Sequence, residues 1–143
     1  MKEEYLCKTP KDMEALGAKF GKQAEKGTVI SLRGSLGAGK TVFARGLARA
    51  LGINESIVSP TFTLIQEYDG TLKMYHMDLY RLSCEEDFMA LGGEDFLYSD
   101  GICLIEWSEI IDEMLPKGTI FVNIKINDDQ SRVVEVTDER SRS

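Results

Sequence analysis

The chain has 143 residues, a length that fits one domain with its own hydrophobic core. Its formal net charge of −7 argues against a protein that holds nucleic acid through its own electrostatic field, and it permits docking onto a basic partner protein. Because the sequence shows no apolar signal segment and no bilayer-spanning run of roughly 20 apolar residues, and its three cysteines fit no metal-binding spacing, we expect a cytoplasmic protein with unpaired thiols and no membrane contact.

Two helices with a buried strand between them are predicted for the first part of the chain. Thr9 and Pro10 are typical of a helix cap and a first helical position, and Gly27 is expected to end that helix. Residues 28–32 are rich in β-branched side chains and predict a parallel strand covered on both faces. Apolar residues that recur every four positions then predict an amphipathic helix over residues 39–51.

A hairpin and a third helix are predicted next. The hairpin strands would cover residues 61–68 and 72–78, joined by the turn pair Asp69-Gly70. Ser83 followed by Glu86 has the spacing of a capping box and predicts the start of a helix, which a pair of glycines would end.

The last part predicts a second buried strand, a short helix and a closing strand pair. Residues 102–106 are four apolar residues and an acid, and Cys103 among them is expected to be a buried free thiol. Ser108 is expected to cap the short helix, and residues 119–126 and 132–136 are expected to pair.

The order of these elements predicts an α/β fold. We expect a three-layer sandwich of the phosphate-loop NTPase type, with a central mixed, largely parallel sheet and an antiparallel hairpin. Residues 1–137 would form a single domain, and residues 138–143, with alternating charges and serines, would form a flexible tail.

The glycine-rich segment between the first buried strand and the second helix predicts the chemistry. It matches the phosphate-loop pattern, in which glycines and the N-terminus of the next helix bring backbone amides to phosphate oxygens. Lys40 is placed to reach the β- and γ-phosphates, and the Thr41 hydroxyl is placed to bind Mg²⁺. We therefore expect ATP or ADP with Mg²⁺ to lie along Ser35, Leu36, Gly37, Ala38, Gly39, Lys40, Thr41 and Val42.

A phosphate-loop site also needs an acidic residue at the end of a neighbouring strand. Glu106 follows four apolar residues and has the expected form, and Asp78 is a second candidate that could orient water. Either residue could instead be a strand-end acid that faces water. We assign catalytic roles to Lys40, Asp78 and Glu106, and Mg²⁺ binding to Thr41 and Glu106.

Other polar and aromatic residues keep two interpretations each. Trp107 would be a packing residue or a gate beside the phosphates. Thr61 and Thr63 would belong to an ordinary strand entry or to a switch that senses the γ-phosphate. His76 would be a hydrogen-bonded structural residue or a catalyst, and Arg81 would form a surface ion pair or stabilise phosphate charge.

Four segments stand out by their order and spacing along a short chain. They read GSLGAGKT at 34–41, SPTFTL at 59–64, YHMDLYRL at 75–82 and ICLIEW at 102–107. Together they resemble the TsaE (also called YjeE) ATPases of bacterial threonylcarbamoyladenosine biosynthesis, a tRNA modification beside the anticodon. The resemblance covers nearly the whole chain, and the last three segments are more specific than the phosphate loop, which many families share.

The resemblance implies an ATPase that acts with the TsaD and TsaB proteins and resets their complex between turnovers. The acidic balance of the chain also suggests that any tRNA is held mainly through partners. Carried over by position, the resemblance implies nucleotide and Mg²⁺ binding by Lys40 and Thr41, a Mg²⁺-side acid at Glu106, an active-site acid at Asp78, and a switch-like or gating role for Thr61, Thr63 and Trp107.

The sequence departs from this family at two positions of the loop. The family usually has Asp where this chain has Ser35, and often Thr where it has Val42. Because the glycines and the lysine are kept, nucleotide binding should survive. If the loop aspartate helps catalysis in the family, the hydrolysis rate of this chain would differ.

Two other functions remain open at the level of sequence. A small-molecule kinase usually carries a lid with several arginines, and here the arginines are scattered. A GTP-binding switch module normally needs an Asn-Lys-x-Asp segment, and this chain contains no Asn-Lys pair. The chain is also short enough that a slow ATPase, completed by partner proteins, is the expectation.

Overall fold

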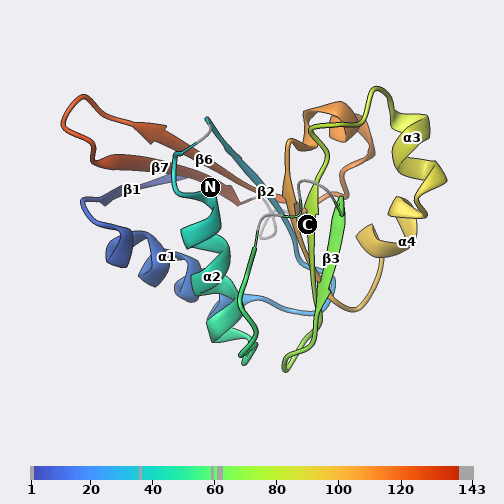
Figure 1. Cartoon of the computed structure of the whole chain (residues 1–143), viewed down its shortest axis with the longest axis horizontal. Coiled ribbons are helices and arrows are strands. Elements are labelled where there is room, and N and C mark those ends of the chain that lie inside the picture. The colour runs from blue at the N-terminus through green and yellow to red at the C-terminus, as the bar shows by residue number, and fades with distance from the viewer. Residues whose placement is uncertain (1, 36, 59, 61–62, 139–143) are drawn as a thin grey trace.

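The computed structural model describes residues 2–35, 37–58, 60 and 63–138. The described residues form a seven-stranded sheet in the order β1-β7-β6-β2-β5-β4-β3, with helices on both faces (Figure 1). In chain order the elements are β1 (Lys2–Cys7), α1 (Pro10–Gln23), β2 (Val29–Gly34), α2 (Lys40–Ala50), β3 (Ile65–Tyr68), β4 (Met74–Asp78), α3 (Glu85–Ala90), α4 (Gly93–Leu97), β5 (Ile102–Glu106), the 3₁₀ helix η1 (Ser108–Met114), β6 (Ile120–Ile126) and β7 (Arg132–Asp138).

The sheet has a parallel centre and antiparallel borders. Strands β6, β2, β5 and β4 run parallel, whereas β1 and β7 on one side and β3 on the other pair antiparallel. The prediction of a three-layer α/β sandwich with a mixed, largely parallel sheet and an antiparallel hairpin is confirmed. The carboxyl ends of β2, β5 and β4 lie next to one another, and in such sheets ligands bind at that edge.

The layer formed by α1 and α2 packs its helices at backbone contact. A Cβ atom added to Gly46 would lie 1.9 Å from the Glu14 carbonyl oxygen, and one added to Gly17 would lie 2.2 Å from that of Phe43. Only glycine allows such an approach. Thr9 and Asp12 form a capping box at the start of α1, so the predicted cap is confirmed.

The opposite layer consists of the short helices α3, α4 and η1. It covers a second apolar cluster that includes Met77, Phe88 and Ile105. Cys103 belongs to this cluster, and its thiol donates a hydrogen bond to the Phe96 carbonyl oxygen at 3.0 Å. Cys103 is free and buried, so the prediction of a buried free thiol is confirmed. Burial raises the pKa of this thiol to about 12.

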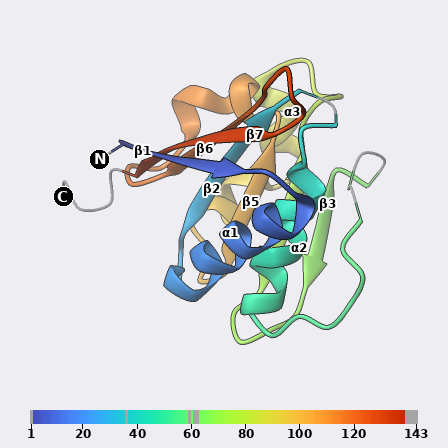
Figure 2. The same cartoon turned by 90° about the vertical axis from the view of Figure 1, so that its left-hand side faces the viewer.

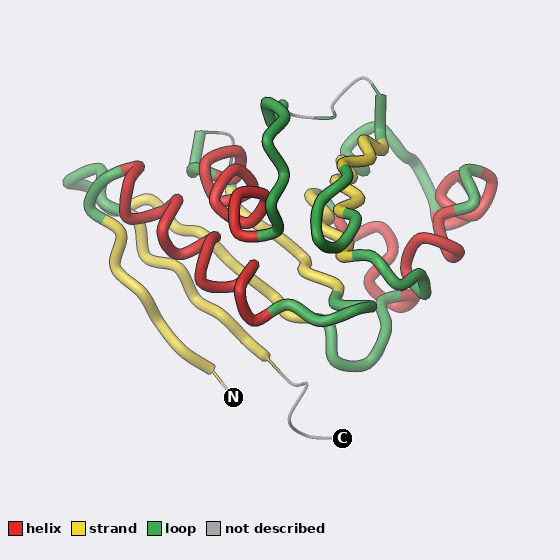
Figure 3. The backbone as a smooth tube through the Cα atoms, turned by 90° about the horizontal axis from the view of Figure 1, so that it is seen from below, coloured by secondary structure: helices red, strands yellow, loops and turns green. Residues whose placement is uncertain are grey.

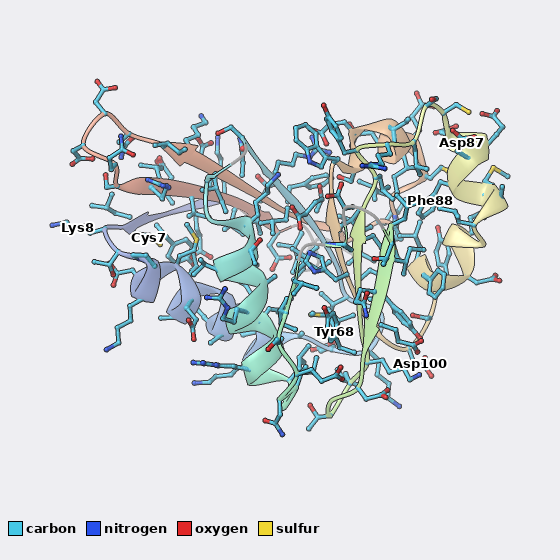
Figure 4. All side chains as sticks on the ribbon, viewed as in Figure 1. Cys7, Lys8, Tyr68, Asp87, Phe88 and Asp100 are labelled. Carbon is cyan, nitrogen blue, oxygen red and sulfur yellow. The ribbon has the colours of Figure 1, made fainter. Side chains whose placement is uncertain are left out.

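Charge is distributed unevenly along the chain. Residues 82–116, which include α3, α4 and η1, hold ten of the 24 acidic residues and none of the 17 lysines and arginines. The rest of the chain is therefore nearly balanced, with a small positive excess. Figure 4 shows Asp87 and Phe88 on α3 at one end of the molecule and Cys7 and Lys8 at the opposite end.

The sequence did not predict β1. This strand borders β7 at the edge of the sheet (Figure 2), and within it only Cys7 is buried. A strand with one neighbour and charged residues on its exposed positions lacks the apolar alternation by which strands are recognised.

Several predicted turns and caps were wrong in their physical detail. The chain between β3 and β4 is longer than a two-residue turn. Gly70 instead allows close packing against Leu51, because a Cβ atom added to Gly70 would lie 2.3 Å from the Leu51 carbonyl oxygen. Cys84, not Ser83, precedes α3, and no side-chain cap forms there among the described residues. Helix α1 ends at Gln23, four residues before the predicted stop at Gly27.

Candidate functional site

The phosphate loop joins β2 to α2, as the motif requires. Gly37 and Gly39 have φ angles of 81° and 108°, a region that other residues rarely occupy. Among the described residues, no side chain caps the start of α2, and its first turn contains no acid. The amide end of α2 is therefore open to an anion, in contrast to the capped α1.

A cavity of about 740 Å³ lies over this loop and the neighbouring strand ends. It brings together residues from α2, from the ends of β4 and β5, and from the chain just after them. Its lining includes Ser35, Gly37, Gly39, Lys40, Thr41, Val42, Asp78, Tyr80, Glu106 and Trp107.

Asp78 and Glu106 face each other at the ends of adjacent parallel strands. They are register partners in the β4–β5 ladder, and their exposed fractions are 5% and 4%. The Asp78 carboxylate accepts a hydrogen bond from the Tyr80 amide at 3.0 Å. Both predicted acids therefore lie in the cavity that the phosphate loop lines, and neither faces bulk water.

The Glu106 carboxylate contacts two side chains from different elements, Lys40 of α2 and His76 of β4. Its Oε1 atom lies 3.6 Å from Lys40 Nζ, and its Oε2 atom lies 2.7 Å from His76 Nε2. Lys40 Nζ also lies 4.6 Å from the centre of the Trp107 ring, a cation–π contact. The lysine that should meet phosphate is therefore held in this structure by Glu106 and Trp107.

Trp107 has a left-handed backbone conformation, with φ 58°. Its ring packs against Tyr80, whose ring centre is 4.9 Å away. The next residue, Ser108, does not cap η1 as predicted, and its hydroxyl instead forms a buried hydrogen bond of 2.6 Å with that of Ser31 in β2. Ser31 also accepts a hydrogen bond from Arg33 Nε at 3.1 Å, so the turn after β5 is tied to β2.

Arg132, at the start of β7, supports the loop from the other side. Its guanidinium donates hydrogen bonds to the carbonyl oxygens of Ala38, at 3.1 Å, and Gly37, at 3.3 Å. These contacts satisfy two carbonyl oxygens of the loop. Ala38 itself is buried and lines a second, smaller cavity beside the loop.

Of the remaining predicted residues, Thr63 and Arg81 are described by the structure and are not part of the cavity lining. Leu36 and Thr61 lie outside the described residues. Thr63 is exposed and is not part of the cavity lining, and its hydroxyl lies 3.5 Å from Gln66 Oε1. Arg81 is exposed and likewise absent from the lining.

The donor atoms present fit Mg²⁺ better than a softer metal. The Thr41 hydroxyl and the carboxylates of Asp78 and Glu106 offer oxygens, which Mg²⁺ prefers, in one cavity. In the described part of the chain, no group of three His, Cys, Asp or Glu side chains could hold a metal ion. This set is incomplete by itself, as expected where phosphate oxygens supply further ligands.

Sequence reasoning gave too little weight to His76 and missed Tyr80 and Arg132. His76 and Asp78 are two positions apart on one strand, so their side chains share a face, and this signal could have linked His76 to the site. No comparable signal exists for Arg132, because its contacts join segments 94 and 95 residues apart.

Residues 7–134 match the sequence profile of the family described as "Threonylcarbamoyl adenosine biosynthesis protein TsaE". Curated proteins named "tRNA threonylcarbamoyladenosine biosynthesis protein TsaE" are similar along most of their length. The one from Treponema pallidum is 43% identical, covering 92% of this chain and 97% of that protein, and the one from Bacillus subtilis is 41% identical, covering 90% and 80%.

A solved structure is also similar. The crystal structure of YdiB from Bacillus subtilis superimposes with a TM-score of 0.86 at 34% identity, covering 99% of this chain and 88% of that one. In the described part of this chain, no helix is both long and apolar enough to cross a membrane.

Proposed function

Since this chain belongs to the TsaE family of tRNA threonylcarbamoyladenosine biosynthesis proteins, we propose that it binds ATP with Mg²⁺ and hydrolyses it in support of that modification. The observation that supports the proposal most strongly is that three features lie at one cavity. These are the phosphate loop with Lys40, the open amide end of α2, and the buried acids Asp78 and Glu106.

The loop residues would bind the triphosphate through backbone amides, with Lys40 on the β- and γ-phosphates. Thr41 and Glu106 would hold Mg²⁺, which when bound neutralises charge that develops on the phosphate oxygens. Asp78 would orient the water that attacks the γ-phosphorus. The bond to the bridging oxygen then breaks, and the products are ADP and inorganic phosphate.

The purine would occupy the smaller cavity beside the loop. This cavity has a volume of about 220 Å³ and shares Gly37, Gly39 and Val42 with the larger one. Met13 and the apolar part of Arg132 border it, and such surfaces suit the faces of a base. The shared residues would let one nucleotide extend from the phosphate cavity into this one.

We further propose that TsaD and TsaB complete the site and hold most of the tRNA. The larger cavity opens to solvent, and Tyr80 at its edge is 64% exposed. A site that is open to solvent excludes water poorly, so turnover by the isolated chain should be slow. The net charge of −7 fits a protein that leaves tRNA binding to its partners.

The test measures ATP hydrolysis by the purified chain, alone and with TsaD and TsaB from the same organism. We expect slow turnover alone, an increase with both partners, and a loss of about 100-fold in Lys40→Ala. Lys73→Ala is the matched control, because Lys73 is half exposed and pairs with Glu67 on the β3–β4 hairpin, away from the cavity lining.

Each alternative outcome is informative. Fast turnover without partners would contradict the partner-completed site. Tight ATP binding without hydrolysis in any mixture, together with phosphate transfer to a small molecule, would replace the proposal with a kinase. Equal losses in Lys40→Ala and Lys73→Ala would show that the cavity is not where ATP reacts.

A further inference from the structure

The two oxygens of Glu106 have different partners, and the partners differ in what nucleotide binding would do to them. Oε1 lies 3.6 Å from Lys40 Nζ, at the mouth of the loop. Oε2 lies 2.7 Å from His76 Nε2, in the fully buried interior of β4. Because a carboxylate only accepts hydrogen bonds, His76 Nε2 is the donor in this contact.

A nucleotide would compete with Glu106 for the Lys40 ammonium group. If ATP binds as proposed above, Lys40 Nζ would be drawn away from Oε1, from which it lies 3.6 Å, toward the β- and γ-phosphates. Glu106 would then lose one of its two partners at the moment when Mg²⁺ needs a fixed acid nearby. The contact from His76 is on the opposite oxygen, so this exchange does not disturb it.

Burying the His76 imidazole in the core costs free energy, because one of its polar nitrogens is unpaired among the described residues. Its side chain is fully buried, and within the described residues its Nδ1 atom has no hydrogen-bond partner. Its cross-strand neighbours are Leu104 in β5 and Gln66 in β3, and Met74 lies two positions before it in β4, on the same face of the sheet. An aliphatic residue would pack here without a buried unpaired nitrogen, so the imidazole needs a reason other than packing.

We propose that His76 is a positioning residue for Glu106. Its hydrogen bond to Oε2 would keep the Glu106 carboxylate in place when Lys40 is drawn away from Oε1, so that Glu106 would stay available to hold Mg²⁺. This proposal rests on the proposed function, and it assigns His76 no contact with nucleotide or metal. Losses of 10- to 100-fold in metal affinity are typical when such a supporting hydrogen bond is removed.

The decisive comparison uses two amides of different length. The side-chain nitrogen of Gln can reach the position of imidazole Nε2, whereas that of Asn reaches only the position of Nδ1. ADP affinity is measured for the whole chain by Trp107 fluorescence, with Mg²⁺ and with EDTA. ADP affinity should rise with Mg²⁺ concentration, and the Mg²⁺ concentration at the midpoint of this rise is compared between proteins. We expect His76→Asn to raise this midpoint at least 10-fold and His76→Gln to stay within about 3-fold of wild type. ADP affinity in EDTA should change less than 2-fold in both.

A second measurement needs no substitution, so it stands even if a variant fails to fold. His76 is the only histidine, and its ring nitrogens can be assigned without ambiguity by ¹⁵N NMR. We expect the proton on Nε2 in the free protein and in the Mg²⁺–ADP complex alike, while the Trp107 signal shifts as Lys40 leaves its ring.

The outcomes separate this inference from the function on which it rests. Loss of the Nε2 proton in the complex, or wild-type Mg²⁺ dependence in His76→Asn, would overturn the role of His76 alone. Equal losses in the Asn and Gln variants would reduce His76 to a packing residue. If wild type itself shows no Mg²⁺-dependent nucleotide binding, both proposals fail together.

Discussion

The α1–α2 layer meets the sheet through helices of 14 and 11 residues, whereas the opposite layer consists of helices of five to seven residues. Figure 3 shows the long helices over one part of the strands and the short ones grouped at the other end. The long helices contact each other through backbone at Gly17 and Gly46, while the short ones depend on individual links such as Ser108 to Ser31 and Cys103 to Phe96.

This difference corresponds to what each layer contributes to the site. Helix α2 presents its amide end to the phosphate cavity, so its position must be fixed along its length. The opposite layer leads into and out of β5, and it supports the turn that bears Trp107. We therefore expect the first layer to be sensitive to added volume and the second to the loss of single hydrogen bonds.

The largest expected effect is that of added volume between α1 and α2. Gly46→Ala should lower the free energy of unfolding by about 3 kcal/mol, because its methyl group would meet the Glu14 backbone and flexible side chains cannot relieve the clash. Urea denaturation measures the change. The matched variant is Gly92→Ala in the other layer, where φ is 74° but nothing lies within 4 Å of the new Cβ. Gly92→Ala should lower the free energy of unfolding by about 1 kcal/mol. Equal losses of stability in the two variants would contradict the proposed difference between the two layers.

A smaller effect is expected from the buried thiol under the short helices. Burial raises the pKa of the Cys103 thiol from its ordinary value of 9.0 to about 12 in the folded chain. Between these values the folded chain keeps a proton that the unfolded chain releases, so this contribution is complete below pH 9 and is lost as pH rises toward 12. By pH 10, wild type should therefore have lost about 1.4 kcal/mol more stability than Cys103→Ala. Parallel curves for the two proteins would contradict the prediction.

The smallest effect is expected at the link between η1 and β2. Ser108→Ala removes one buried hydrogen bond, so stability should fall by about 1 kcal/mol. Because Ser108 follows Trp107 directly, the fluorescence of this only tryptophan should also change. Ser83→Ala is the control, since Ser83 is exposed and should stay within about 0.5 kcal/mol of wild type. An unchanged tryptophan spectrum in Ser108→Ala would mean that the link does not hold the turn.

The elements that could be predicted from the sequence are those with a periodic apolar pattern or a contiguous motif. Helix α2 and strands β2 and β5 are apolar on regular positions, and the phosphate loop is written in contiguous residues. Strand β1 was missed because its stability comes from the ladder to β7, more than 120 residues away, and not from its own pattern.

The same distinction applies within the site. Lys40, Thr41 and the strand-end acids were predictable because each follows from the loop motif or from a strand that ends in an acid. The contact between His76 and Glu106 depends on how β4 and β5 are aligned, and a single sequence does not contain that register. Ser108 illustrates the opposite error, since its residue type suits a helix cap while its hydroxyl is engaged with Ser31 in a distant strand.

The uneven charge between residues 82–116 and the rest of the chain gives the protein an electric dipole. Seen from far away the molecule carries −7, but within a Debye length of about 8 Å each end acts by its own local charge. Near a positively charged surface the molecule should therefore rotate before contact, so that its α3–α4 end faces that surface. Added salt should weaken this preferred orientation, even where it leaves the fold unchanged.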